Sequence, residues 1–430
     1  MHKTILTGAL TLALPLASAS VFAQEPASYD AEISAIHAAP EFALAADHIA
    51  AQHDMRVRDL VTLTEIAAPP FAEETRAAAY AEMFRATGFG EVSIDAVGNV
   101  VATRRGRSGE RTVAMVAHID TVFPPETDVT VTIEGNRYAA PGIGDNTRGA
   151  IMLLELASAI AAAGIETEAD IVLVGNVGEE GLGDLRGVRH LFREGAEHPD
   201  AMIAIDGGDE TRLVTGAIGS NRYRVTFHGP GGHSWGDFGD PNPHHAAARA
   251  VRLFAEAARP ITLEGNRSSF NIGRTGGGTS VNSIPFESWM EVDMRSGDPE
   301  RLALLDAAFQ AAMQAGLAAE NDAMGEGDRL TVEIEPIGVR PAGQGDVSTP
   351  LVQRALAALR ASGLEAETAA SSTDANIPIS MGIPAITISR CGSGDGAHSL
   401  GEYWVDDESV VPCTVRGLAI LLAEAGLAAD

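Results

Sequence analysis

The chain is poor in cysteine, in aromatic residues and in basic side chains. Two cysteines in 430 residues are too few for a scaffold built on disulfides. Only 30 lysines and arginines face 59 aspartates and glutamates, so the formal net charge is −29. Phosphate groups would be repelled by such an acidic surface, which argues against nucleic acid and anionic membranes as partners.

Apolar residues are abundant by contrast. Hydrophobic types make up 45% of the chain, too many for a disordered protein. An apolar run from about Ile5 to Leu16 follows Lys3, and Ala23 precedes a plausible cleavage site. This pattern is typical of a signal peptide over residues 1–23, and the run is shorter than the roughly 20 residues of a membrane span. We therefore expect an exported chain, periplasmic or secreted, with no membrane anchor.

Two parts of the chain, residues 24–216 and 339–430, alternate patterns of buried strands with helical patterns. Continuous apolar runs such as RTVAMVAHID and DIVLVGNVGEE indicate strands that are buried on both faces. Alanine-rich stretches with helical spacing, such as residues 41–67 and 149–164, accompany them. This alternation predicts an α/β domain with a mostly parallel sheet.

Residues 217–338 show a different pattern. The segment RYRVTFHG alternates apolar and polar residues, as a half-exposed strand does. Helical and strand patterns then follow in the order β-α-β-β-α-β, which suits a small antiparallel sheet with helices on one face. The sequence thus predicts an α/β domain that is interrupted by an inserted α+β domain.

Imidazole and carboxylate side chains gather at the predicted strand ends of the α/β domain. Ligands bind at the carboxyl ends of strands in open α/β sheets, so we expect these side chains to lie close together. Asp145 and His398 do not directly follow a predicted strand. Asp145 precedes a helix, and His398 lies in a glycine-rich loop after the strand AITISR. The candidates are His118, Asp120, Asp145, Glu179, Glu180, Asp206 and His398.

A divalent metal would explain why so many carboxylates gather at one edge. Packed together without a cation, they would repel one another and raise each other's pKa. A mixture of histidine and carboxylate ligands suits Zn²⁺, and also Co²⁺ or Mn²⁺. Two histidines with three carboxylates exceed the needs of one tetrahedral zinc that keeps a water, so a bridging carboxylate and two ions are expected.

Each residue alone has an ordinary interpretation. A single His-x-Asp is usually a surface pair, and Asp206 at a strand end could cap a helix. The coincidence of all of them at strand ends, beside glycines, favours the metal site. Cys391 and Cys413 could form a disulfide or remain two separate buried thiols, and the sequence leaves both open.

The motifs place the chain close to a known family. It resembles the zinc exopeptidases that include peptidase T, glutamate carboxypeptidase, aminoacylase and succinyl-diaminopimelate desuccinylase. The motifs occur in the family's order and cover nearly all of the expected mature chain. They read AHIDTV, GIGDNTRG, GNVGEEGLGDLRG, AIDGG, GPGGHS, SVNSIP and GDGAHSLGEYW.

The resemblance implies a role for each candidate. Asp145 would bridge two divalent ions, most readily Zn²⁺, and the bond to Asn146 would be cis. His118 and Asp206 would complete one ion's ligands.

Glu180 and His398 would complete the ligands of the second ion. Asp120 would hydrogen-bond the far nitrogen of His118 and so fix its tautomer. Glu179 would be the general base that activates water, rather than a ligand.

The inserted domain resembles the family's lid and dimerisation domain. The resemblance implies that His233 stabilises the oxyanion, in many members from the partner subunit of a homodimer. Asn282 and Arg295 match lid positions that hold a substrate carboxylate. Without the family, His233 could be a plain turn residue, and Arg295 could simply pair with Asp298.

The function implied is hydrolysis of an amide bond in a short peptide. Aspartate at position 206 leans toward a dipeptidase, tripeptidase or aminopeptidase. An N-acyl-amino-acid deacylase or a carboxypeptidase with the same machinery is the first alternative. A binding protein that uses the cleft without catalysis is the second.

Overall fold

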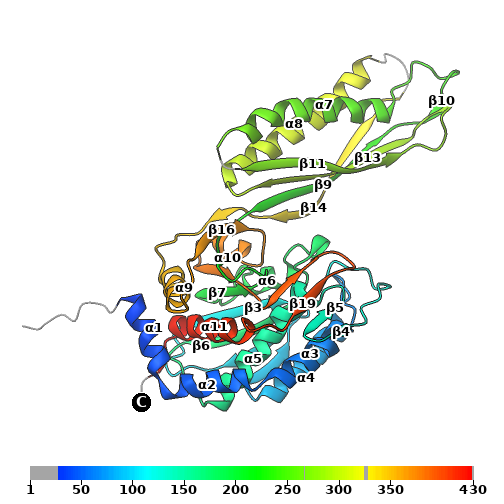
Figure 1. Ribbon diagram of the computed structural model, residues 1–430. Helices are drawn as coiled ribbons and strands as arrows, with labels where there is room; N and C mark the ends of the chain where they lie inside the picture. The colour runs from blue at the N-terminus through cyan, green and yellow to red at the C-terminus, as the bar shows by residue number, and fades with distance from the viewer. Residues whose placement is uncertain (1–27, 266, 324–327, 429–430) are drawn as a thin grey trace, which may run out of the picture.

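The computed structural model describes residues 28–265, 267–323 and 328–428. The predicted signal peptide lies outside these residues. The described chain forms an α/β domain and an inserted domain that extends from it, and the two are connected through β9 (Gly219–His228) and β14 (Thr331–Arg340) (Figure 1).

A mixed sheet forms the centre of the α/β domain. Its strands run in the order β1-β2-β6-β3-β7-β17-β8-β15, with β16 paired to β8. The central neighbours β6, β3, β7 and β17 are parallel, which confirms the predicted parallel core, whereas β1, β2 and β15 pair antiparallel at the edges. The bounds are β1 Glu91–Ile94, β2 Val100–Arg104, β3 Thr112–His118, β6 Asp170–Asn176, β7 Ala201–Ile205, β8 Arg212–Ala217, β15 Gly343–Gln344, β16 Glu367–Ser371 and β17 Ala385–Ile388.

Helices cover both faces of this sheet, as the apolar runs predict. In β3, Val113 and Met115 belong to the larger core, whereas Ala114 and Val116 belong to a second core on the other face. The larger core is formed with α1 Tyr29–Ala38, α2 Pro40–Ala50, α3 His53–Thr64, α4 Glu74–Thr87, α5 Gly149–Ala162, α9 Pro350–Ala361 and α11 Val410–Ala425. The second core is formed with α6 Arg186–Leu191 and α10 Asn376–Ser380.

One predicted helix is two in the structure. The alanine-rich stretch 41–67 divides into α2 and α3 at a turn through Ala51 and Gln52. Neither glycine nor proline marks that turn, so the sequence pattern runs through it without a visible break.

The inserted domain has the predicted α+β order. Its antiparallel sheet runs β11-β13-β9-β14, with β11 at Ser268–Gly277 and β13 at Glu287–Ser296. Burial alternates residue by residue along β13, because one face of the sheet packs against α7 (Pro243–Leu263) and α8 (Pro299–Ala323). A ribbon of β10 (Gly232–His233) and β12 (Ser283–Ile284) extends from one end.

Within the described residues, α8 is the helix whose length and apolar composition would suffice to cross a bilayer. It lies instead beside α7 on the sheet of the inserted domain (Figure 1). Its buried side chains include Leu305, Phe309 and Met313.

A small antiparallel sheet, β18-β19-β5-β4, was not anticipated from the sequence. It joins β5 (Arg137–Ala139) to β19 (Tyr403–Val405), with β4 at Thr132–Glu134 and β18 at Ser393–Asp395. The pairing fixes the segment before Asp145 to the segment after His398. Nearby, Cys391 and Cys413 form a disulfide, which settles the alternative that the sequence left open.

Candidate metal centre

Four of the predicted ligands converge at the carboxyl edge of the central sheet. His118 is the last residue of β3, and its Nε2 lies 3.3 Å from Oδ1 of Asp145. The other carboxylate oxygen of Asp145 lies 3.2 Å from Nε2 of His398, which is also 2.9 Å from Oε1 of Glu180. Asp145 therefore lies between the two imidazoles, the place that a bridging ligand would take. The ligand atoms of His118, Asp145 and Glu180 are all within 4.8 Å of one another.

Asp206 and Asp120 also lie at the carboxyl edge of the sheet, but they have different contacts. Asp206 follows β7 directly and lines the same cleft as His118 and Asp145. The Asp120 carboxylate accepts hydrogen bonds from the backbone N–H groups of Glu179 and Glu180 at 3.0 and 2.9 Å.

The contact between His118 and Asp120 differs from the expected one. Nδ1 of His118 lies 3.1 Å from the Asp120 carbonyl oxygen and 3.7 Å from its carboxylate. The backbone oxygen is therefore the acceptor in hydrogen-bonding distance. The carboxylate instead orients the loop that carries Glu179 and Glu180.

The loop before α5 has an unusual backbone. The bond between Asp145 and Asn146 is cis, as the family resemblance implied. The Asn146 side chain donates to the carbonyl of Ile205 at the end of β7, at 2.7 Å. A side chain at Gly149 would come within 2.3 Å of the Asn146 amide oxygen, so only glycine fits there.

Burial and mutual charge shift the pKa values of this cluster. Burial, together with the neighbouring charge of Asp145, raises the pKa of Asp206 to about 6. Hydrogen bonds to Asp145 and Glu180 raise the pKa of His398 to about 10. Burial opposes a proton on His118, but its hydrogen bond to Asp145 and the surrounding carboxylates raise its pKa well above the usual value. The carboxylates of this cluster therefore stabilise positive charge on the groups between them.

The donor set fits divalent metal ions. Imidazole nitrogens and carboxylate oxygens are the mixed ligands that zinc, cobalt and manganese accept. Asp145 presents one oxygen to each histidine, so the geometry has room for an ion on either side of this carboxylate. A cation there would balance the same negative charge that raises the pKa of both histidines.

Glu179 lies beside this cluster but faces a different partner. Its Oε1 accepts a hydrogen bond from Nη1 of Arg340 at 2.8 Å, and Arg340 also donates to its backbone carbonyl. Burial raises the pKa of Glu179 well above the usual value, and Arg340 opposes this shift. A buried carboxyl of raised pKa next to the ligands has the properties of a general base.

A cleft of about 430 Å³ opens above these residues, between the two domains. Arg295, predicted to bind substrate, lines it together with Arg222 and Arg340. Arg222 and Arg295 each donate Nε to one oxygen of Asp293, at 2.9 and 2.8 Å. Arg295 therefore pairs with Asp293, not with Asp298. The α/β domain thus contributes imidazole and carboxylate side chains to the cleft, and the inserted domain contributes three arginines.

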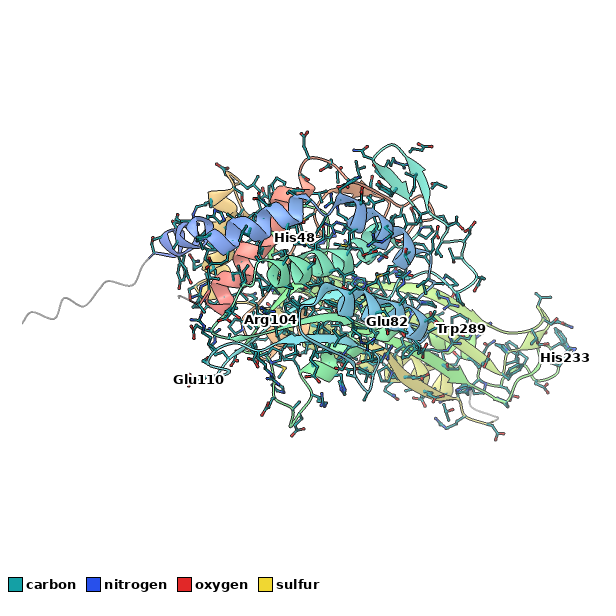
Figure 2. The ribbon with its side chains drawn as sticks, turned by 90° about the horizontal axis from the view of Figure 1, so that it is seen from below. His48, Glu82, Arg104, Glu110, His233 and Trp289 are labelled. Carbon is teal, nitrogen blue, oxygen red and sulfur yellow. A yellow bond between two sulfur atoms is a disulfide. The ribbon has the colours of Figure 1, made fainter. Side chains whose placement is uncertain are left out.

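His233 and Asn282 do not reach this cleft in the single chain. Figure 2 shows His233 at the far end of the inserted domain, remote from the α/β domain, on the ribbon of β10 and β12. Asn282 lies beside it, where its carbonyl accepts from the Ser234 N–H at 3.0 Å. Asn282 therefore lies away from the cleft of its own chain. The ribbon carries both residues away from the sheet that ends at the cleft.

Arg340, Arg222 and Glu402 were not predicted as site residues from the sequence. Arg340 ends β14, two residues beyond the last predicted strand, and Arg222 starts the segment RYRVTFHG. Glu402 follows His398 in the motif GDGAHSLGEYW. An arginine near the start of β9 and another at the end of β14 were a usable signal, but interpreting them required the strand order of the inserted domain.

The fold and the cluster define a metallohydrolase: an α/β sheet with imidazole and carboxylate ligands at its carboxyl edge, and a buried acid beside them. The chain belongs to the peptidase family M20/M25/M40, whose family model matches residues 114–423. It is therefore an enzyme of the peptidase class, and not the non-catalytic receptor considered above.

Known proteins resemble the chain along most of its length. The Bacillus subtilis protein YqjE, described as uncharacterized, is 24% identical over 298 residues, which cover 68% of this chain and 76% of YqjE. The crystal structure of a tripeptidase from Staphylococcus aureus matches with a TM-score of 0.70 at 22% identity, covering 86% of this chain and 98% of the tripeptidase. The dipeptidase Dug1p from Saccharomyces cerevisiae matches with a TM-score of 0.66 at 15% identity, covering 89% and 98%.

Proposed function

We propose that the protein hydrolyses short peptides that carry a free carboxylate, with two divalent ions held at the carboxyl edge of the sheet. The observation that carries this proposal is that one cleft combines candidate metal ligands with arginines. The candidate ligands are His118, Asp145, Glu180, Asp206 and His398, and the arginines are Arg222, Arg295 and Arg340.

Zn²⁺ is the ion that we propose first, with Co²⁺ or Mn²⁺ as alternatives. Bound divalent ions lower the pKa of a coordinated water and polarise an amide carbonyl. Glu179 accepts the proton of the attacking water and later delivers it to the leaving nitrogen, as a buried carboxyl of raised pKa can do near neutral pH. Arg340 keeps Glu179 oriented through its contact with Oε1.

Arg295 and Arg222 orient the substrate. Arg295 donates Nε to Asp293, which leaves the two terminal nitrogens of its guanidinium for a planar carboxylate. Arg222 is held by the same aspartate, so the pair carries one positive charge in excess. The acidic residues lining the cleft are Asp145, Glu179, Glu180 and Asp206, and each already has a role. Among the described lining residues, none remains to bind a substrate ammonium group.

This charge distribution also favours the first alternative, an N-acyl-amino-acid deacylase or a carboxypeptidase. Those enzymes recognise the carboxylate end of the substrate, which the arginines fit. A dipeptidase or tripeptidase needs the same contact and in addition tolerates a free amino group. The two functions therefore use the same cleft and differ in whether the substrate's amino end is free or acylated.

A panel of matched substrates separates them. Ala-Ala-Ala, its C-terminal amide and its N-acetyl derivative are incubated with the purified protein and Zn²⁺, Co²⁺ or Mn²⁺, and products are identified by mass spectrometry. We expect cleavage of Ala-Ala-Ala and little cleavage of the amide. Preferred release of acetate would favour the deacylase, and equal cleavage of peptide and amide would contradict carboxylate recognition.

We propose further that two chains pair through their inserted domains. His233 and its neighbours Trp235 and Phe238 are exposed, the last two at 87% and 84%, and His233 does not reach the cleft of its own chain. In a homodimer, the partner subunit's His233 would approach the cleft and stabilise the oxyanion.

We propose finally that the protein is exported from the cytoplasm. The signal-peptide pattern of residues 1–23 is its basis, and the disulfide between Cys391 and Cys413 supports it, because such bonds persist in oxidising compartments. Mass spectrometry of the protein from the periplasm and the medium would test it. An intact N-terminus in the cytoplasmic fraction would contradict it.

A further inference from the structure

Glu402 is a buried carboxylate whose oxygens face backbone amides instead of the cleft. The residue is 1% exposed and lies between His398 and β19. Its Oε2 accepts from the N–H of Gly142 at 2.7 Å, and its Oε1 accepts from the N–H groups of Gly144 and Asp145 at 2.9 and 2.6 Å. Both oxygens are therefore occupied, and Glu402 is not available as a metal ligand.

The three amides belong to the loop that ends at Asp145. Gly142 has a positive φ of 78°, a conformation that favours glycine. The N–H groups of Gly144 and Asp145 are paired with Glu402, and buried amides need such partners. A side chain at Gly144 would come within 2.9 Å of Oε1 of Glu402, so the loop closes directly on the carboxylate.

The same residue connects this loop to the segment that carries His398. The carbonyl of Glu402 accepts from the N–H of Ala140 at 3.1 Å, and the following residues pair with β5. Side chain and backbone of Glu402 thus both bind the segment 139–145. Asp145 and His398, which come within 3.2 Å of each other, are held as one unit.

We propose that Glu402 is a positioning residue that sets the spacing of Asp145 and His398 for the metal ions. The inference rests on the metal-binding part of the proposed function and not on the substrate. Hydrogen bonds from backbone N–H groups to a carboxylate are charge-assisted and stronger than neutral ones, and residues that orient metal ligands typically change affinity by 10–100-fold when replaced.

Glu402→Gln tests the proposal, with Co²⁺ alone as the probe. Glutamine keeps the shape but replaces one acceptor oxygen by an NH₂ group that would face a donor. We expect Co²⁺ affinity, measured by calorimetry on the full chain, to fall by about 10–100-fold, and the absorption spectrum of bound Co²⁺ to shift. Glu402→Asp keeps the charge and shortens the reach, so we expect an intermediate loss. It also provides the test if the glutamine variant does not fold.

Asp298→Asn is the matched control. The Asp298 carboxylate also accepts from backbone N–H groups, those of Glu300 and Arg301 at the start of α8, in the inserted domain. This variant should lose thermal stability with unchanged Co²⁺ affinity and spectrum. If the Glu402 variants behave in the same way, Glu402 is only structural and the proposal is overturned. It is also overturned if the wild-type protein binds no Co²⁺. Wild-type protein that binds Co²⁺ but cleaves no peptide would contradict the proposed function and leave this inference intact.

Discussion

Nη1 of Arg340 lies 2.8 Å from Oε1 of Glu179, although 161 residues separate the two in sequence. Arg340 is the last residue of β14, the strand that returns from the inserted domain. Glu179 belongs to the loop after β6 in the other domain. The contact therefore links the junction of the two domains to the residue that we assign as general base.

Glu179→Gln should abolish most turnover while the metal stays bound. The amide cannot accept a proton, and loss of a general base typically costs about 10²–10⁴-fold in kcat. Because the amide oxygen still accepts from Arg340, the local structure should be preserved. Metal content by mass spectrometry and kcat with Ala-Ala-Ala are the two measurements. Loss of metal, or activity near that of the wild type, would assign Glu179 another role.

Arg295→Lys should weaken binding of substrates that have a free carboxylate. A lysine offers a point charge where the guanidinium offers two parallel donors. We expect KM for Ala-Ala-Ala to rise by about tenfold, the equivalent of about 1.4 kcal/mol, and kcat to change less. Arg274→Lys is the control, since Arg274 pairs with Glu291 in the same domain and does not line the cleft. Equal effects in both variants would argue against carboxylate binding by Arg295.

The metal-free protein should lose stability as the pH rises above neutral. The pKa of His398 is raised from 6.5 to about 10, so the folded chain holds a proton in this window that the unfolded chain releases. The unfolding free energy therefore falls with increasing pH until the folded pKa is passed. We expect the melting temperature of chelator-treated protein to decline between about pH 7 and about pH 10, and to decline less in His398→Ala. His198→Ala removes a half-buried histidine whose Nε2 lies 2.9 Å from the Arg193 carbonyl oxygen, and this variant should keep the wild-type slope.

Two inactive variants should complement each other if the partner subunit's His233 completes the cleft. His233→Ala and Glu179→Gln are each expected to be impaired, because one lacks the oxyanion donor and the other the base. In a mixed dimer, one of the two clefts has both groups intact. After exchange at equal concentrations, about a quarter of the wild-type activity should return. Activity no greater than that of the separate variants, with dimers present by light scattering, would show that His233 does not act across the interface.

The convergence of His118, Asp145, Glu180 and His398 was predictable because the strand patterns and the glycine-rich motifs mark these residues locally. His118 follows a run that is apolar at every position, and such a strand can only be central and buried on both faces. Polar residues at its carboxyl end must then meet those of the neighbouring parallel strands. The order of the inserted domain was predictable in the same way, from alternation along its strands.

Contacts across the chain were not predictable. Arg340 and Glu402 belong to segments whose neighbours are set by sheet order and by strand pairing, and no local pattern encodes those. The position of Asn282 away from the cleft of its own chain was not predictable for the same reason, because the direction of the ribbon that carries it depends on how the inserted sheet closes.

The sequence by itself indicated which imidazole and carboxylate side chains gather at the carboxyl edge of the sheet, since strand periodicity and motif order act within a few residues. Only the tertiary structure decided which arginines face them and which carboxylate supports the Asp145 loop. Those partners come from segments more than 150 residues apart, and only long-range packing brings them within hydrogen-bonding distance.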